Sequence, residues 1–304
     1  MDASAATPRP SPLRAFLRLS RPLFLYGGFA GVALGAAVAH WSGHRLDAVT
    51  YLWVQLLVSS FHLMVHYAND YFDRESDVGA VRTRWSGGSG VLVDGHLQPR
   101  VALIASVACA ASGLFACARF VVAGNALVAA VGVAILAFAW YYSAPPVRFA
   151  ARGLGELDTA LVVALLFPCA GYAAFAGALD ARIVLAALAP CCAMIAMMLS
   201  VELPDAGCDV RAGKRNLVVR LGPERASRLT AAAAVLAPAA GALTAYGVAP
   251  GAAVLALAPA AAAVVPLLRS LRRASPGGTA FWGVALYAAT VTGLAAFYAL
   301  SAAV

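Results

Sequence analysis

The sequence predicts an all-α, polytopic membrane protein whose helices cross a lipid bilayer. Of the 304 residues, 62% are hydrophobic and 12% are charged, and the mean hydropathy is +0.81. Soluble domains carry about 25% charged residues, so this chain is strongly depleted of charge. Apolar stretches of about 20 residues, the length of a helix that crosses ~30 Å of hydrocarbon, recur along the whole sequence.

The predicted elements are a short tail followed by nine transmembrane helices. The segment "MDASAATPRPSP" predicts a flexible cytoplasmic tail over residues 1–12, and residues 13–304 are predicted to form a single transmembrane domain. The apolar stretches are rich in Ala and Gly, whose small side chains let helices approach closely within a bilayer. In chain order the nine stretches are 23–40, 49–68, 101–122, 124–142, 158–177, 182–203, 229–248, 250–268 and 279–302.

The distribution of Lys and Arg predicts the orientation of these helices. The amino-terminal tail and the loops after the second, fourth, sixth and eighth helices hold 19 basic residues, whereas the opposite loops hold three. Because basic loops stay in the cytoplasm, the amino terminus is predicted to be cytoplasmic. The net charge of +8 therefore reflects the basic residues of the predicted cytoplasmic loops, and no nucleic-acid partner is expected. No CxxC pair occurs, which argues against a disulfide framework or a zinc knuckle.

An acidic cluster ends the second predicted helix, in the stretch "HYANDYFDRESD" (66–77). At 100° per residue, Asn69, Asp70, Asp73 and Asp77 fall within about 100° of arc, on one face of a helix. Glu75 falls on the far side, where Arg74 and solvent can meet it. The pattern indicates a stripe of oxygen ligands, although loop carboxylates are also often solvated or neutralised by neighbouring arginines.

A second acidic pair, Asp205 and Asp209, ends the sixth predicted helix in "ELPDAGCDVRAGKRNL" (202–217). Its i, i+4 spacing again places both carboxylates on one face, with Glu202 one turn earlier. Each cluster lies at the cytoplasmic end of an even-numbered helix, so helices one to four and five to eight look like two related halves. Carboxylates this close repel one another, and a hard cation such as Mg²⁺ relieves the repulsion.

Basic residues accompany both acidic clusters. Arg82 and Arg84 follow the first cluster, and Lys214, the single lysine of the chain, and Arg215 follow the second. Carboxylates that bind Mg²⁺ beside cations that bind phosphate are typical of a diphosphate site. The stretch "SGGSG" (86–90) is able to add backbone N–H donors, although Gly/Ser runs are usually simple loops.

These motifs resemble the UbiA-type intramembrane prenyltransferase family. "NDYFDRESD" is similar to its first aspartate motif, NDxxDxxxD, and "DAGCD" to its second, DxxxD. The resemblance continues through "RP" (21–22), "YYSAPPVRFAARGLGE" (141–156) and "GKRNLVVRLG" (213–222) and covers nearly the whole chain. It implies nine helices around a central cavity that opens sideways to lipid, in a protein of a bacterial inner membrane with its active site on the cytoplasmic side.

The resemblance also implies roles for individual residues. Mg²⁺ on an isoprenyl diphosphate would be held by Asn69, Asp70, Asp73, Asp77, Asp205 and Asp209, among which Asp70, Asp73, Asp205 and Asp209 would be catalytic. Arg82, Lys214 and Arg215 would bind the diphosphate. The allylic cation would be stabilised by aromatic rings, for which Tyr71, Phe72, Tyr141 and Tyr142 are candidates. Arg152, with Arg21 and His66, would orient an acceptor.

The acceptor implied by the resemblance is a hydroxylated aromatic quinone precursor. "LPDAGCDVRAGKRNLVVRLG" and "ARGLGE" look most like the branch that prenylates 1,4-dihydroxy-2-naphthoate, whereas the loop "SGGSGVLVDGHL" and Pro204 depart from that branch. Other branches use other acceptors, and a few relatives cyclise the isoprenyl diphosphate without any acceptor. The motifs do not separate a transferase from such a cyclase, because both ionise the diphosphate.

Two other classes of function remain as alternatives. An ion-coupled transporter would bury its ionisable groups near the bilayer midplane, whereas here they lie at helix ends. A transition-metal site is suggested by His62 and His66, which are four residues apart and continue to Asp70. A histidine pair on one helix is more often engaged in packing or hydrogen bonding.

Overall fold

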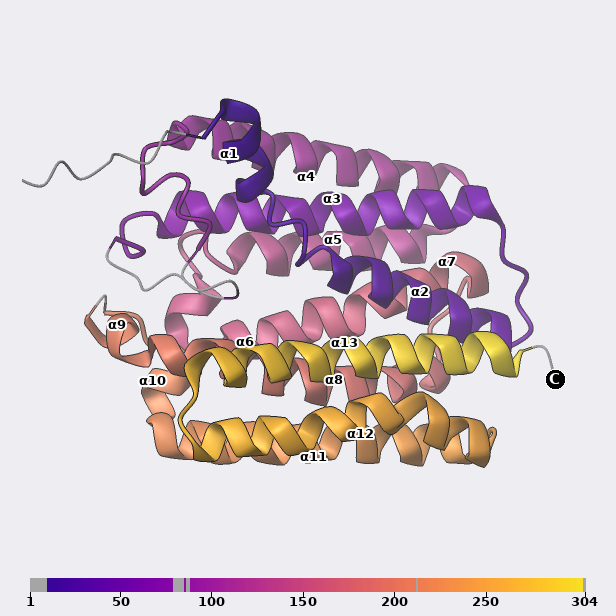
Figure 1. Cartoon of the computed structure of the whole chain (residues 1–304). Coiled ribbons are helices and arrows are strands. Elements are labelled where there is room, and N and C mark those ends of the chain that lie inside the picture. The colour runs from indigo at the N-terminus through magenta and orange to yellow at the C-terminus, as the bar shows by residue number, and fades with distance from the viewer. Residues whose placement is uncertain (1–9, 79–84, 86–87, 212, 303–304) are drawn as a thin grey trace, which may run out of the picture.

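The fold is a bundle of long antiparallel helices, seen in a computed structural model that describes residues 10–78, 85, 88–211 and 213–302 (Figure 1). The described residues form helices and no strand, as the composition predicted. The elements are α1 (Pro12–Leu19), α2 (Tyr26–Trp41), α3 (Ala48–Asp73), α4 (Pro99–Val122), α5 (Ala126–Tyr141), η1 (Phe149–Arg152), α6 (Gly155–Thr159), η2 (Ala160–Leu166), α7 (Phe167–Ala176), α8 (Ala181–Glu202), η3 (Leu203–Asp205), α9 (Ala206–Arg211), α10 (Leu217–Leu221), α11 (Pro223–Tyr246), α12 (Pro250–Arg272) and α13 (Pro276–Ser301).

Seven helical segments of the described chain are long and apolar enough to cross a membrane. They correspond to seven of the nine predicted stretches: α3, α4, α6 to α7, α8 to α9, α11, α12 and α13. The other two stretches, 23–40 and 124–142, contain α2 and α5, each of 16 residues. Sixteen helical residues span about 24 Å, which is shorter than the ~30 Å hydrocarbon layer. The predicted count of nine membrane-crossing helices is thus met in part.

Local signals in the sequence set the starts of these helices. The side chains of Asp47, Asn125 and Asp180 accept hydrogen bonds from backbone N–H groups in the first turns of α3, α5 and α8. Proline occupies the first turn of α4, α11, α12 and α13, where its missing N–H group costs nothing. Sequence inspection did not identify α1, which begins at Pro12 with Ser11 as its cap; residues 1–9 of the predicted tail lie outside the described residues.

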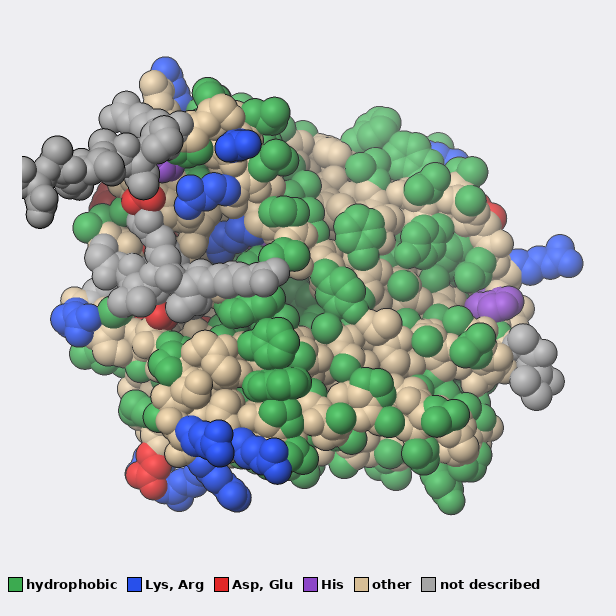
Figure 2. All heavy atoms as spheres, viewed as in Figure 1, with side chains coloured by type: hydrophobic (Ala, Val, Ile, Leu, Met, Phe, Trp, Pro, Cys, Tyr) green, Lys and Arg blue, Asp and Glu red, His purple; other side chains and the backbone are tan. Residues whose placement is uncertain are grey.

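The outer surface of the bundle is apolar. Large side chains such as Val122, Leu243 and Leu255 are 85%, 82% and 77% exposed, and Figure 2 shows hydrophobic side chains over the middle of the molecule. A water-soluble monomer rarely exposes such extensive apolar surface. On this face most Lys and Arg side chains gather toward the end that carries α9 and α10 (Figures 1 and 2). The protein is an integral membrane protein.

Helix α2 packs directly on α7 because glycine replaces a side chain at the crossing. A Cβ on Gly35 would collide with the carbonyl oxygen of Pro168, and a Cβ on Gly171 would lie 2.6 Å from the carbonyl oxygen of Val32. This contact holds α2 against the middle of the bundle. It thereby positions the start of α2 at Tyr26, which follows Arg21 closely in the sequence.

We expect Gly35→Leu to destabilise the protein by about 2 kcal/mol or more, because a side chain at this crossing forces the two helices apart. The free energy of unfolding, or the midpoint of thermal unfolding in detergent, measures the effect. Gly251→Leu is the matched control: Gly251 also lies in a helix, but a Cβ there meets no atom within 4 Å. Equal loss of stability in both variants would contradict the packing role of Gly35.

Candidate functional site

A cavity of 670 Å³ opens at the end of the bundle where both acidic clusters lie. Its wall is acidic and basic at this end, with Asp73, Asp77, Asp205, Asp209 and Lys214. It is apolar and aromatic elsewhere, with side chains that include Phe61, Val163, Phe167, Met194 and Met198. One cavity therefore combines a charged region with a long apolar region.

Helix α3 forms one wall of the cavity through a single helical stripe. His62, His66, Asn69 and Asp73, at spacings of three or four residues, all line it. α3 ends at Asp73, but the backbone N–H of Asp77 still donates to the carbonyl oxygen of Asp73 over 2.9 Å. This extra turn keeps Asp77 on the cavity side. Glu75 points away and accepts a hydrogen bond of 2.9 Å from Arg74, as the helical pattern predicted.

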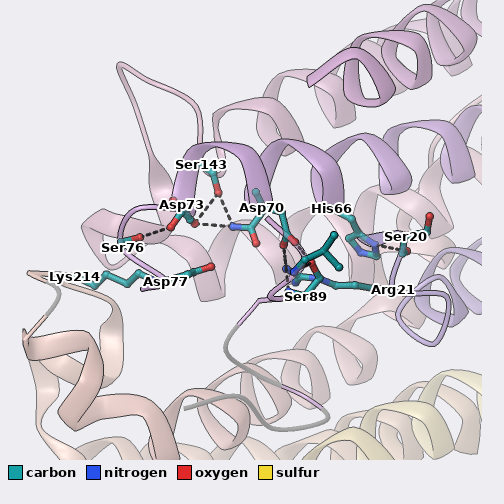
Figure 3. Close-up of polar contacts among 12 residues, drawn as sticks. Ser20, Arg21, His66, Asp70, Asp73, Ser76, Asp77, Ser89, Ser143 and Lys214 are labelled. Carbon is teal, nitrogen blue, oxygen red and sulfur yellow. Dashed lines mark hydrogen bonds and ion pairs between the residues drawn. The ribbon is translucent and has the colours of Figure 1, made fainter. Parts of the chain in front are cut away.

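Asp73 is held in place by a small polar network (Figure 3). The Asn69 amide donates to Asp73 Oδ2 over 2.7 Å and to the Ser143 hydroxyl over 2.8 Å, and Ser143 donates to the same carboxylate over 3.2 Å. The Arg148 guanidinium lies 3.8 Å from Asp73 Oδ1. The Asp73 side chain is 12% exposed, and these contacts fix its carboxylate in orientation at the edge of the cavity.

Asp70 faces a different set of partners from the rest of the stripe. Its carboxylate forms an ion pair with Arg21 and accepts a hydrogen bond from the Ser89 hydroxyl, and the Ser89 N–H lies 3.4 Å from Oδ1 (Figure 3). Asp70 is buried but does not line the cavity, whereas Arg21 and Ser89 do. The structure therefore places Asp70 behind the first row of cavity residues.

Lys214 joins the two acidic clusters. Its Nζ donates to Asp77 Oδ1 over 2.9 Å and lies 4.0 Å from Asp209 Oδ1, although 137 residues separate Lys214 from Asp77. Burial by itself lowers the pKa of Lys214, but the carboxylates of Asp77, Asp73 and Asp209 raise it by more, so the pKa ends above its ordinary value. The ammonium group stays charged between the two clusters.

The second acidic cluster faces the first across the cavity. Asp205 is buried at the end of η3, and Asp209 lies in α9, where the Asn216 amide donates to Oδ2 over 2.7 Å. Glu202, one turn earlier, also lines the cavity. The helical path from α8 through η3 to α9 keeps all three carboxylates on the cavity side, as the i, i+4 spacing predicted.

The remaining predicted site residues are divided between the cavity and the surface. Tyr142 lines the cavity, close to the carboxylates of Glu202 and Glu156. Tyr141, Arg152 and Arg215 are exposed and do not line it; Arg152 donates to the carbonyl oxygen of Pro146 over 2.8 Å. Arg82, like Arg84, lies outside the described residues.

Sequence reasoning did not find the roles of Ser143, Arg148 and Asn216, and it gave Arg21 no part in binding the first cluster. Arg21 and Arg148 share an unusual backbone, with φ of +45° and +53°. Non-glycine residues seldom adopt such angles, and the strain is typical of functional sites. Each of these arginines directs its guanidinium to an aspartate of the first cluster, Arg21 to Asp70 and Arg148 to Asp73.

The donor set of the cavity suits Mg²⁺. Its charged region presents carboxylate and amide oxygens, which are the ligands of a hard cation, and Cys208 and His66 line the cavity near them. In the described part of the chain these side chains do not form a closed group of three or more metal ligands; Lys214 instead provides the positive charge between Asp77 and Asp209. A cation is therefore what this arrangement of carboxylates requires.

Comparison with protein families gives a match over most of the chain. The model of the UbiA prenyltransferase family matches residues 29–287. A comparison with curated protein sequences finds no match.

Several solved structures share the fold. A digeranylgeranylglyceryl phosphate synthase is 15% identical, with a TM-score of 0.65, and the alignment covers 94% of this chain and 100% of that one. A UbiA homologue from Archaeoglobus fulgidus, bound to GPP and Mg²⁺, is 19% identical with a TM-score of 0.61 and coverage of 95% and 97%. A UbiA homologue from Aeropyrum pernix K1 is 17% identical with a TM-score of 0.71 and coverage of 88% and 96%.

Proposed function

The chain belongs to the UbiA prenyltransferase family, and from this premise we propose that it transfers an isoprenyl group from a prenyl diphosphate to a hydroxylated aromatic acceptor within the membrane. The protein is a prenyltransferase; the donor, the acceptor and the metal are the proposed part. The observation that carries the proposal is the single cavity, which joins two facing acidic clusters to an apolar interior.

The charged end of the cavity is suited to a diphosphate. The carboxylates of Asp73, Asp77, Asp205 and Asp209 would hold Mg²⁺, with Asn69 as a further ligand, and the metal would neutralise charge on the diphosphate as it leaves. Asp70 would join them only by giving up its contacts with Arg21 and Ser89. Mg²⁺ in the structure of the Archaeoglobus fulgidus homologue with GPP supports this reading. Lys214, Arg21 and Arg148 surround the same place and supply N–H donors to phosphate oxygens.

The apolar end suits the isoprenyl tail and the cation formed from it. When the C1–oxygen bond breaks, its electron pair leaves with the diphosphate and C1 becomes part of an allylic cation. Tyr142 lines the same cavity with Glu202 and Asp73 among its neighbours, and its ring can stabilise that cation. The buried wall, with Phe61, Phe167 and Met194, excludes water that would quench it.

We also propose that α2 and α5 cross the membrane, which gives nine crossings for the domain 13–304. The amino terminus and the site then face the cytoplasm of a bacterial cell, as the 19 to three distribution of basic residues favours. The acceptor branch closest to the motifs is that of 1,4-dihydroxy-2-naphthoate in quinone biosynthesis.

Acceptor dependence tests this function. Membranes that contain the protein, given geranyl diphosphate and Mg²⁺ alone, should release diphosphate slowly and form hydrolysis products. Addition of 1,4-dihydroxy-2-naphthoate or another hydroxylated aromatic compound should accelerate release and give a C-prenylated product, and chelation of Mg²⁺ by EDTA should stop both reactions. Rapid formation of one cyclic product without an acceptor would instead identify a cyclase.

A further inference from the structure

Glu156 of α6 carries a fully buried carboxyl group that the proposed chemistry does not use. Its side chain is 0% exposed and does not line the cavity. Oε1 accepts a hydrogen bond of 2.7 Å from the backbone N–H of Leu217, the first residue of α10, which lies 61 residues farther along the chain. A buried carboxyl group is costly unless it is hydrogen-bonded. This long-range contact therefore indicates that Glu156 holds the start of α10.

The held backbone lies directly beside the second acidic cluster. Asn216, the residue before Leu217, is 7% exposed and lines the cavity. Its Nδ2 donates to Asp209 Oδ2 over 2.7 Å, while its Oδ1 accepts from the backbone N–H of Val219 over 2.9 Å. One side chain thus joins the start of α10 to a carboxylate of the cluster. Since the two residues are neighbours, an anchor at Leu217 limits where the Asn216 amide can reach.

Lys214 belongs to the same short segment, three residues before Leu217. Its backbone N–H donates to the carbonyl oxygen of Asp209 over 2.9 Å, and its Nζ donates to Asp77 Oδ1 over 2.9 Å. The position of Leu217 therefore bears on two groups that reach the acidic clusters, the Asn216 amide and the Lys214 ammonium group.

The chain that precedes Glu156 packs against this segment as well. The backbone N–H of Arg215 donates to the carbonyl oxygen of Ala151 over 3.3 Å. Gly153 has φ of +72°, and a Cβ there would lie 2.8 Å from the carbonyl oxygen of Arg215. Residues 151–156 thus form a support for residues 214–217, with Ala151 against Arg215 and Glu156 against Leu217.

We propose that Glu156 is a positioning residue that acts through its hydrogen bond to Leu217. The fixed backbone at Leu217 keeps the Asn216 amide on Asp209. It also keeps Lys214 between the two acidic clusters. The inference rests on the proposed function, in which Asp209 would hold the metal and Lys214 would bind the diphosphate.

Three substitutions separate the hydrogen bond from the charge of Glu156. Glu156→Ala removes both. Glu156→Gln removes the charge but keeps an oxygen that accepts from Leu217, and its amide can donate to the carboxyl group of Glu202, which lies beside Glu156. Leu217→Pro removes the N–H donor instead. Proline is tolerated at the first residue of a helix, and Asn216 before it already has the extended backbone that proline requires, with φ of −60° and ψ of 170°.

Steady-state kinetics and hydrogen exchange measure the two consequences. Glu156→Ala and Leu217→Pro should each raise the KM for geranyl diphosphate about 5- to 30-fold, whereas Glu156→Gln should stay within about threefold of the wild type. In the protein without Mg²⁺ or diphosphate, peptides from 214–222 should exchange their amide hydrogens about tenfold faster in the first two variants and at the wild-type rate in Glu156→Gln. Asn216→Ala should raise the KM in the wild type but by no more than about twofold in Glu156→Ala, because Glu156 acts through Asn216.

Asn125→Ala is the matched control. Asn125 also caps a helix, α5, and joins it to a distant segment by donating to the carbonyl oxygen of Ala173 over 2.9 Å, but it does not line the cavity. The variant should unfold at a lower temperature and keep the wild-type KM and the wild-type exchange of 214–222. An equal rise of the KM in Glu156→Gln and Glu156→Ala would overturn the positioning role. So would a lower unfolding temperature of Glu156→Ala with unchanged KM and exchange. If Glu156→Ala does not insert, Leu217→Pro decides by the same criteria.

The same preparation separates failure of this role from failure of the proposed function. Mg²⁺-dependent diphosphate release from geranyl diphosphate is measured on the wild type in parallel. Its absence would overturn the proposed function, whereas hydrogen exchange, which needs neither substrate nor metal, decides whether Glu156 holds the segment.

Discussion

Asp73→Ala should reduce diphosphate release by roughly 10²- to 10³-fold, the size of effect seen when one essential electrostatic group is removed from an active site. Asp73 carries one of the carboxylates of the first cluster and accepts hydrogen bonds from Asn69 and Ser143. The substitution removes the charge and releases both partners. Asp205→Ala removes a carboxylate from the facing cluster and should have an effect of similar size.

The measurement is the initial rate of diphosphate release from geranyl diphosphate by membranes, normalised to the amount of inserted protein. Glu224→Gln is the control, because Glu224 is an exposed carboxylate that pairs with Arg228 far from the cavity lining. It should retain wild-type activity. If either aspartate variant keeps more than a few per cent of activity at saturating Mg²⁺, the two clusters do not act as one site.

Lys214→Gln should raise the KM for the prenyl diphosphate about 10- to 100-fold, since a charge-assisted contact to phosphate is lost at a partly buried position. Because Lys214 also neutralises Asp77 and Asp209, its removal leaves these carboxylates freer to bind a cation. The Mg²⁺ concentration for half-maximal rate should therefore stay the same or fall while the KM for the diphosphate rises.

Steady-state kinetics with geranyl diphosphate and Mg²⁺ varied in turn distinguish these two effects. Arg228→Gln also removes one positive charge, but its side chain is 72% exposed and lies on the surface, so it should leave both constants unchanged. A higher Mg²⁺ requirement with an unchanged KM for the diphosphate would mean that Lys214 serves only to orient the carboxylates.

The acidic stripe of α3 could be predicted because a helix fixes the spacing of its own side chains. Asn69, Asp73 and Asp77 line the cavity together, and Glu75 points away, as 100° per residue requires. The same periodicity could not show that Asp70 faces Arg21 and Ser89, because those partners belong to segments 49 residues before it and 19 residues after it. Only the packing of the amino-terminal segment and the loop beside α3 decides this.

The positions and types of the helices show the same division between local and long-range information. Apolar runs predicted where helices lie, and caps and prolines fix where many of them start. The run over 158–177 nevertheless divides into α6, η2 and α7, and the π-helical turns of η2 bring Val163 against Gly27 of α2. A π-helix is less favourable than an α-helix, so it persists only where packing supports it. Composition alone therefore does not predict it.

By itself, the sequence determined the properties that arise from neighbours along the chain: an all-α membrane protein, two acidic clusters at helix ends, and a basic group near each. The tertiary structure decided which groups from distant segments meet. It placed Lys214 beside Asp77 across 137 residues and set His62 and Tyr287, from α3 and α13, around one glycine of α2. The physical reason is that helical periodicity constrains side chains only within one helix, whereas a cavity is formed by the packing of several helices.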